Sequence, residues 1–218
     1  MISPLAVQSA SPRGLIRCNS GTNGKVRMGE GGLIMKPTTR KIVLTGMLSA
    51  IAFVFSLLDF HIIPGMEFLS YDPTDIPIMF TGLLFGPVYA FFSALIVPVL
   101  KFVLGMSHTG PFGVIMKVIA SSSYCIPAAI IYDRTKTRKA ALIGLAIGCV
   151  CMTVIMIPTN YFITPLYLGC KSEDIVPMLP PLALFNLAKS VFNSIVIFFS
   201  YKPVVTALRK SKLLDERS

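Results

Sequence analysis

The sequence predicts an all-α integral membrane protein with six transmembrane helices, a short second helix and both termini in the cytoplasm. Of its 218 residues, 54% are hydrophobic and only 14% are charged, and the apolar residues fall into long runs. An average soluble domain has about 25% charged residues, whereas a membrane-spanning helix needs about 20 predominantly apolar ones. The composition therefore excludes an ordinary soluble domain.

The apolar runs predict helices at about residues 42–59, 76–86, 87–104, 113–132, 140–164 and 182–207, within a membrane domain of residues 35–218. Residues 1–34 have low hydrophobicity and are rich in Gly and Ser, so we expect them to be a disordered N-terminal extension. Two alternatives stay open for this segment, a transit peptide and translated sequence upstream of a start at Met35. No candidate binding residue lies in it.

The basic residues indicate the orientation of the chain in the membrane. Of the 20 Lys and Arg residues, seven precede Ile42, four lie between Asp133 and Lys139, and five follow Tyr201. The connections on the opposite side carry one basic residue, Lys171, and the acidic residues Asp59, Glu67, Asp72, Asp75, Glu173 and Asp174. This distribution follows the positive-inside rule. The net charge of +10 therefore reports topology, and we expect a lipid bilayer and no nucleic acid as partner.

The first predicted helix carries small residues at helical spacing, including Gly46, Ser49 and Ala50. Small side chains allow two helices to approach closely within lipid. The pattern predicts that these three residues contact a neighbouring helix. The sequence leaves open whether that helix belongs to this chain or to another subunit.

The second predicted helix is unusually short because Gly86 and Pro87 interrupt it. From Asp75 to Gly86 a helix would rise only about 16 Å, roughly half of a bilayer core. We therefore expect Asp75 below the outer surface, together with its connecting loop. Non-helical backbone at such depth must be buried in protein or line a cavity. Asp72 and Asp75 have no further ligands nearby, so we predict no metal site.

The last predicted helix carries a polar stripe of Asn186, Lys189, Ser190 and Asn193, which follow at i, i+3, i+4 and i+7. Exposing the Lys189 ammonium to lipid would cost about 2.5 to 3.5 kcal/mol. The stripe must therefore face protein or ligand. We interpret it as the wall of a buried pocket rather than as a structural helix contact.

Other polar residues are predicted at the same depth as this stripe. Lys117 lies in the first turns of the fourth helix and Asn160 near the outer end of the fifth, so both join Asp75, Asn186 and Lys189 in the outer half. Structural polar residues would scatter in depth, whereas a ligand site collects them. We therefore predict an externally loaded pocket.

The groups in this pocket suit a flat heteroaromatic ligand with an amide-like edge and a polyol tail. Two carboxamides can read paired donors and acceptors, a carboxylate can bind hydroxyls, and aromatic residues such as Tyr71 and Tyr161 can stack. The sequence contains no phosphate-binding loop, no zinc-protease motif and no nucleophile-elbow motif. We expect no enzymatic activity, no catalytic residues and no bound cofactor.

Four sequence segments resemble a known family. They are Tyr71-Asp72-Pro73-Thr74-Asp75-Ile76-Pro77, the run Gly82 to Pro87, Asn160-Tyr161-Phe162 with Pro165-Leu166-Tyr167, and Phe185-Asn186-Leu187-Ala188-Lys189. Together they resemble the riboflavin-binding S component of energy-coupling factor (ECF) transporters, and the similarity extends over about residues 36–210.

The resemblance implies that Asn160, Asn186 and Lys189 bond the pyrimidine edge of riboflavin, and that Asp75 meets its ribityl chain. The further candidate ligand residues are Tyr71, Thr74, Lys117 and Tyr161. It also implies that the small-residue face of the first helix docks on a transmembrane coupling subunit, which two ATPase subunits drive with ATP. The resemblance places the protein in the plasma membrane.

The chain departs from the family pattern in the fourth helix, where Val114-Ile115 replaces an Asn-Phe pair that relatives often carry. Lys117 either compensates for this loss or extends its ammonium to the interface. Two other functions stay open at this point. One is an S component for another vitamin-like ligand, such as folate or a queuosine precursor, and the other is a self-sufficient secondary carrier.

Overall fold

We describe a computed structural model of the chain, which covers residues 28–29, 32–33, 37–58, 60–61, 70–107 and 109–210. The chain divides into two compact units, residues 1–35 and 36–218. In the first unit, strand β1 (Met28–Gly29) pairs with strand β2 (Gly32–Leu33) in an antiparallel manner. Nearly all of the predicted N-terminal extension lies outside the described residues.

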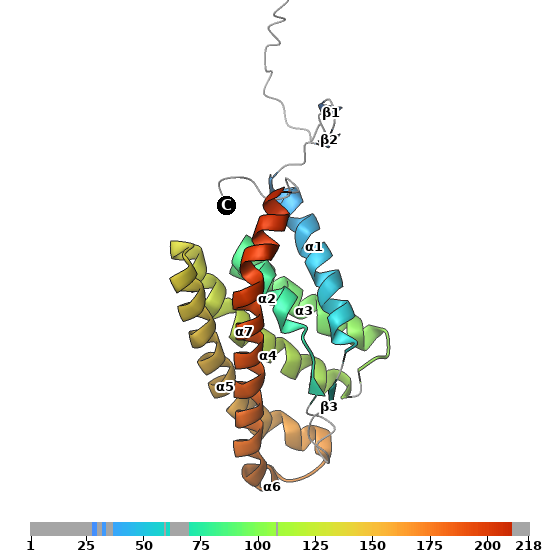
Figure 1. Cartoon of the computed structure of the whole chain (residues 1–218). Helices are drawn as coiled ribbons and strands as arrows, with labels where there is room; N and C mark the ends of the chain where they lie inside the picture. The colour runs from blue at the N-terminus through green and yellow to red at the C-terminus, as the bar shows by residue number, and fades with distance from the viewer. Residues whose placement is uncertain are drawn as a thin grey trace, which may run out of the picture. The chain divides into compact units, whose positions relative to one another are not determined.

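The second unit is a bundle of long helices (Figure 1). They are α1 (Pro37–Ser56), α2 (Asp75–Phe85), α3 (Pro87–Val103), α4 (Gly110–Thr135), α5 (Arg138–Leu168) and α7 (Leu179–Lys210). Within the part of the chain that the structure describes, four stretches are long and apolar enough to cross a membrane, namely Thr38–Ser56, Gly110–Thr135, Arg138–Leu166 and Ser172–Val204, and α2 and α3 are shorter apolar helices. The predicted fold class, six helices with a short second one, is confirmed.

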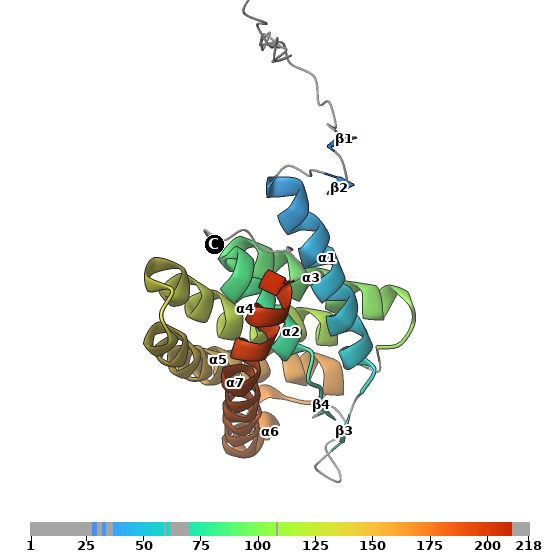
Figure 2. The same ribbon diagram turned by 45° about the horizontal axis from the view of Figure 1, so that its top comes forward.

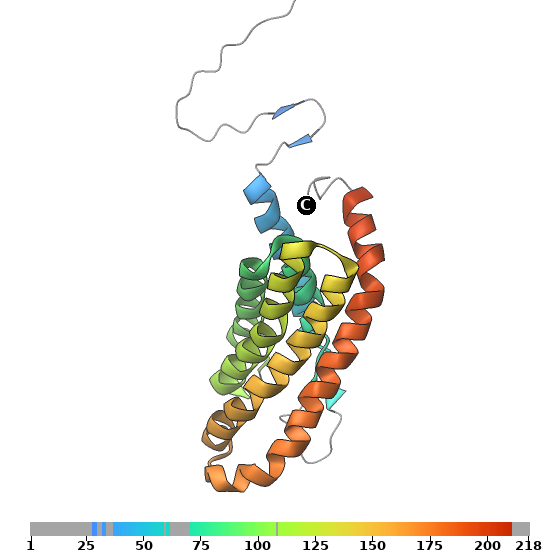
Figure 3. The same cartoon turned by 90° about the vertical axis from the view of Figure 1, so that its left-hand side faces the viewer.

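Four small elements supplement the predicted helices. Strand β3 (Phe60–His61) pairs with strand β4 (Ser70–Tyr71) between α1 and α2. A short helix α6 (Ser172–Ile175) and a 3-10 turn η1 (Val176–Met178) connect α5 to α7. In Figures 1 and 3, the start of α1, the α4–α5 turn and the end of α7 lie at one end of the bundle, and α6 lies at the other. The basic segments thus share one end, as the predicted topology requires.

Four helices extend beyond the predicted bounds at an end that contains proline. Helix α1, predicted at residues 42–59, begins at Pro37 and ends at Ser56. Pro111 lies in the first turn of α4, and Pro180 and Pro181 lie in the first turn of α7. The first helical turn has no intrahelical partner for its N–H groups, so proline fits there. Pro165 lies inside α5, near its end. Sequence patterning alone assigns such prolines to loops.

The break between α2 and α3 depends on one glycine. Gly86 has φ 104° and ψ 173°, a conformation that favours glycine, and Pro87 then begins α3. Nine of the eleven residues of α2 are buried, so this helix is surrounded by protein on nearly all sides. Its first residue, Asp75, therefore lies in the interior of the bundle.

Helices α4 and α5 pack closely, side by side, while α1 lies against α2 and α3 (Figure 2). A Cβ atom added at Gly148 would lie 2.5 Å from the carbonyl oxygen of Tyr124, and one at Gly144 would lie 2.9 Å from that of Ala128. Only glycine allows this separation between the two helices. The fully buried side chains of Tyr124, Leu145 and Met152 fill the adjacent core.

Candidate functional site

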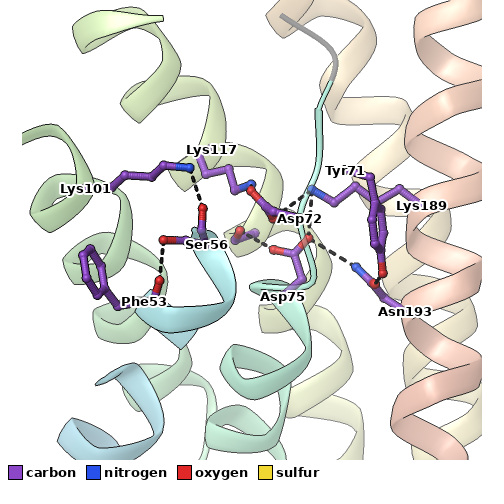
Figure 4. A network of polar contacts seen from close by, with 10 residues as sticks. Phe53, Ser56, Tyr71, Asp72, Asp75, Lys101, Lys117, Lys189 and Asn193 are labelled. Atoms are coloured by element: carbon purple, nitrogen blue, oxygen red, sulfur yellow. Dashed lines mark hydrogen bonds and ion pairs between the residues drawn. The ribbon is translucent and has the colours of Figure 1, made fainter. Parts of the chain in front are cut away.

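Four charged residues come together in the outer half of the bundle (Figure 4). Asp72 follows strand β4, Asp75 begins α2, Lys117 lies in the outer part of α4, and Lys189 lies in the outer part of α7. We call these four residues the charged cluster. Two helices, the start of a third and the end of a strand thus supply one site.

Lys189 is the centre of the charged cluster. Its Nζ lies 3.5 Å from Asp72 Oδ1 and 3.4 Å from Asp75 Oδ2, and Lys117 forms an ion pair with Asp72 Oδ2. The side chains of Lys189, Asp72 and Asp75 are only 6%, 3% and 1% exposed, and that of Lys117 is 24% exposed. With every group ionised, the cluster has two positive and two negative charges and is neutral. Mutual pairing compensates for the loss of hydration.

Neutral polar groups complete the surroundings of Asp75. Ser121 Oγ donates a hydrogen bond to Asp75 Oδ1 at 2.5 Å, and Asn193 Nδ2 approaches Asp75 Oδ2 at 3.5 Å. Tyr71 in turn donates from its hydroxyl to Asn193 Oδ1 at 2.8 Å. Burial is the main factor that raises the pKa of Tyr71, so its phenol stays protonated at neutral pH and can donate.

The two predicted carboxamides bond to their own helices. Asn160 Nδ2 donates to the Met156 carbonyl oxygen at 2.7 Å, and Asn186 Nδ2 donates to that of Leu182 at 3.0 Å. Asn160 is 3% exposed and Asn186 is 8% exposed, and their helices α5 and α7 pack together. Both amides therefore lie inside the outer half of the bundle, although none of their described hydrogen bonds joins them to the charged cluster.

The other two candidate residues have different surroundings. The Thr74 hydroxyl is buried next to Asp75 and has no hydrogen-bond partner in the described part of the chain. An unsatisfied buried hydroxyl costs about 1 to 3 kcal/mol, so this group is available to a ligand. Tyr161 is half-buried and packs edge-on against Phe162 at 5.2 Å between ring centroids.

Sequence reasoning did not identify Asp72 and Ser121 as partners of the predicted residues, and it placed Asn193 in the polar stripe without its contacts to Asp75 and Tyr71. Asp72 was considered as half of a metal pair and as part of a family segment, but not as a counter-charge, and its carboxylate faces two lysines. Among the described residues, no three His, Cys, Asp or Glu side chains form a metal-binding group. A usable signal was present, because two lysines at pocket depth need two anions and only Asp72 and Asp75 lie nearby in the topology.

The role of Lys117 follows from the same geometry. Its ammonium pairs with Asp72, and its side chain is 24% exposed. Lys101, in contrast, donates from Nζ to the Ser56 carbonyl oxygen at 2.6 Å, close to the end of α1 (Figure 4). A cation at a helix C-terminus satisfies a free carbonyl and favours the helix dipole.

The small-residue face of α1 is divided between two environments. Ser49 is buried and hydrogen bonds to Ser93 of α3 at 2.7 Å, so it contributes to packing within the chain. Gly46 and Ala50 are exposed, as are the nearby apolar side chains of Met47 and Val54. The surface available to another subunit therefore contains Gly46 and Ala50 without Ser49.

The fold and the site define a six-helix membrane protein with a buried, charge-neutral polar centre on the side opposite its basic ends. A model of the family described as "ECF transporter, substrate-specific component" matches residues 40–201. The chain belongs to this family. It is thus a multi-pass plasma-membrane subunit of a transporter that works with an ECF module, and it is not an enzyme.

Two curated relatives resemble most of the chain. The riboflavin transporter FmnP of Bacillus subtilis (strain 168) is 29% identical over 191 residues, which cover 80% of this chain and 98% of the relative. The riboflavin transporter RibU of Staphylococcus aureus (strain TCH60) is 29% identical over 178 residues, which cover 78% of this chain and 93% of the relative.

A solved structure gives the same result at the level of the fold. The S component of a bacterial ECF transporter superposes with a TM-score of 0.70 at 29% identity, over 78% of this chain and 98% of the other. The similarity therefore extends over nearly the full length of these proteins.

Proposed function

We propose that this chain is the riboflavin-binding specificity subunit of an ECF importer, which captures the vitamin from outside and delivers it with a separate coupling and ATPase module. Two riboflavin transporters that are similar over nearly their whole length support the ligand. The observation that carries the proposal is the set of buried polar residues that α2, α4, α5 and α7 contribute at one depth.

Riboflavin matches these groups in charge and in hydrogen-bonding capacity. It is uncharged at neutral pH, so it does not disturb the balance of the charged cluster, whereas a phosphorylated flavin would add negative charge to a neutral, buried site. The carboxamides of Asn160 and Asn186 offer donors and acceptors to the pyrimidine edge, and Lys189 adds a donor. Asp75 accepts hydrogen bonds from ribityl hydroxyls, and Thr74 offers its unpaired hydroxyl nearby.

In the ligand-free chain, the contacts of Lys189, Asn160 and Asn186 are of a kind that a bound ligand can join or replace. The Lys189 contacts of 3.4 and 3.5 Å are longer than a firm hydrogen bond of about 2.7 to 3.2 Å, so a ligand oxygen can join them at small cost. The amides of Asn160 and Asn186 bond locally to their own helices. Ligand groups can replace those local bonds one for one, which keeps the net cost of binding low.

The partners follow from the family. We infer that the exposed face of α1 with Gly46 and Ala50 docks on a transmembrane coupling subunit, and that two ATPase subunits supply the energy. Ser49, which bonds to Ser93, supports this face from behind. The sequence itself contains no phosphate-binding loop that would hydrolyse ATP.

The direct test is flavin binding by the chain purified in detergent. We expect a yellow preparation, and titration of riboflavin should quench flavin fluorescence until one ligand is bound per chain. Since the chain has no Trp, the flavin signal is the better reporter. A colourless protein that leaves riboflavin fluorescence unchanged would contradict the proposal and favour a different vitamin ligand, such as folate.

Transport measurements separate a subunit from a self-sufficient carrier. In proteoliposomes, the chain alone should bind riboflavin without accumulating it under an ion gradient. Addition of the coupling and ATPase subunits with ATP should start uptake. Accumulation by this polypeptide alone would identify a secondary carrier.

A further inference from the structure

A cavity lies at the opposite, cytoplasmic end of the bundle from the charged cluster. This cavity of about 180 Å³ opens between α2, α5 and α7. Its apolar wall includes Leu83 of α2, Leu145 of α5 and Ile197 of α7, all of which are buried. The charged cluster contributes no residue to this lining, so the two sites are separate.

Two cations line the same cavity. Arg138 is the first residue of α5, and Lys202 lies near the end of α7. Both side chains are exposed, and neither has an ion pair or hydrogen bond with any other residue that the structure describes. No acidic residue lines the cavity. The site therefore combines an apolar interior with uncompensated positive charge.

The position of the cavity identifies the environment of its opening. Arg138 and Lys202 belong to the basic segments that face the cytoplasm. Tyr201, which also lines the cavity, hydrogen bonds to Tyr132 of α4 through the two hydroxyls, and tyrosines are frequent at the level of lipid headgroups. Phe198 and Phe199, 41% and 74% exposed, line it as well. The opening thus lies where lipid headgroups and the first carbons of their acyl chains are found.

We propose that this cavity binds one anionic phospholipid of the cytoplasmic leaflet. The phosphate lies between Arg138 and Lys202, and the beginning of an acyl chain lies against Leu83, Leu145 and Ile197. Basic pockets between transmembrane helices on the cytoplasmic side are a recognised form of lipid site. The proposal depends on the membrane topology and not on the identity of the transported vitamin.

The test uses the full chain, reconstituted with equal amounts of phosphatidylglycerol and phosphatidylcholine that carry the same acyl chains, then extracted and analysed by native mass spectrometry. Two basic residues predict a roughly thirtyfold preference for the anionic lipid. The double variant Arg138→Ala, Lys202→Ala should bind both lipids equally. Equal retention of the two lipids by the parent protein would overturn the proposal.

A matched control removes two other exposed charges from the same end of the bundle. The variant Arg134→Ala, Lys139→Ala has the same net charge as the test variant, but neither residue lines the cavity. It should keep the full preference for phosphatidylglycerol. Loss of that preference in the control would show a diffuse surface effect and would refute a defined site.

Two additional measurements keep the test decisive. If the double variant does not fold, as judged by helical circular dichroism and its elution in detergent, Arg138→Gln alone should weaken the preference about fivefold. Inorganic phosphate in large excess should leave the bound lipid in place, because the acyl chain contributes to binding. Displacement of the lipid by phosphate alone would contradict a lipid site. A double variant that no longer assembles with the ECF module, although its lipid preference is unchanged, would contradict it as well.

Discussion

Helix α7 carries two lysines, Lys189 and Lys202, that differ in burial and in ion pairing. Lys189, in the outer half, is 6% exposed and lies between the carboxylates of Asp72 and Asp75. Lys202, near the inner end, is exposed and has no partner among the described residues. A buried charge is stable only when the tertiary structure brings its counter-charges, whereas a charge at the membrane surface needs only water or a lipid headgroup.

The difference has a consequence for function. The inner lysines and arginines determine topology and, as we propose, hold a lipid, and each acts almost independently of the others. The charged cluster acts as one unit, since the removal of any member leaves its positive and negative charges unbalanced. Substitutions in the charged cluster should therefore affect both folding and ligand binding, and those at the inner end should affect neither strongly.

The largest effect is expected for Lys189→Ala. The variant leaves the carboxylate of Asp75 without a cation, so the free energy of unfolding should fall by about 3 to 5 kcal/mol, and riboflavin binding should be lost. Thermal unfolding in detergent and flavin fluorescence titration measure the two effects. The double variant Lys189→Ala, Asp75→Asn should regain stability but not binding. Wild-type affinity in Lys189→Ala would refute the site.

Asn186→Ala should come next, with a selective effect on binding. The amide bonds only to its own helix in the ligand-free chain, so its loss should change stability by less than about 1 kcal/mol. Riboflavin affinity should fall by about 1 to 3 kcal/mol, since ligand groups are left unpaired. Asn160→Ala should behave in the same way, and unchanged affinity in both variants would show that the amides do not contact the ligand.

Lys117→Ala should have a smaller effect than Lys189→Ala on stability. Lys117 is 24% exposed, so water can partly replace it at Asp72, which also keeps its contact with Lys189. We expect a loss of about 1 to 2 kcal/mol in the free energy of unfolding. Lys117→Arg, which keeps the charge, serves as the control. An effect as large as that of Lys189→Ala would show that the two lysines are equivalent.

Tyr71→Phe removes one hydrogen bond, the one from the hydroxyl to Asn193 Oδ1, and keeps the ring against Phe192. The expected loss of stability is about 1 kcal/mol. Because burial raises the pKa of Tyr71, its phenol stays protonated around neutral pH, and it should cause no change in riboflavin binding between pH 6 and 9. A change in riboflavin affinity between pH 6 and 9 that occurs in the parent protein but not in Tyr71→Phe would contradict this prediction.

The smallest effect is expected for deletion of residues 2–34, which contain no candidate binding residue. Affinity for riboflavin and the thermal midpoint in detergent should match those of the full chain. A large decrease in affinity would show that this segment contributes to the site.

The depth of several site residues in the membrane could be predicted from the sequence. The positions of Asn160, Asn186 and Lys189 along their helices follow from the start of each apolar run, so their location in the outer half was accessible from the sequence. Their hydrogen-bond partners were not, because an amide can bond to its own helix, to a neighbour or to a ligand with similar energies. The contacts of Asp72 were missed because it lies between β4 and α2, where helical spacing does not determine the direction of a side chain.

The sequence by itself determined the number of helices, their orientation and the depth of the polar residues. The length of each apolar run and the charges that flank it are local properties, and they determine how each segment inserts into the bilayer. Only the tertiary structure decided that Asp72 and Asp75 face Lys189, that Ser49 bonds to Ser93, and that α2, α5 and α7 leave a cavity between them. These contacts join residues far apart in the chain. They depend on how each helix rotates about its axis, which packing against the other helices determines.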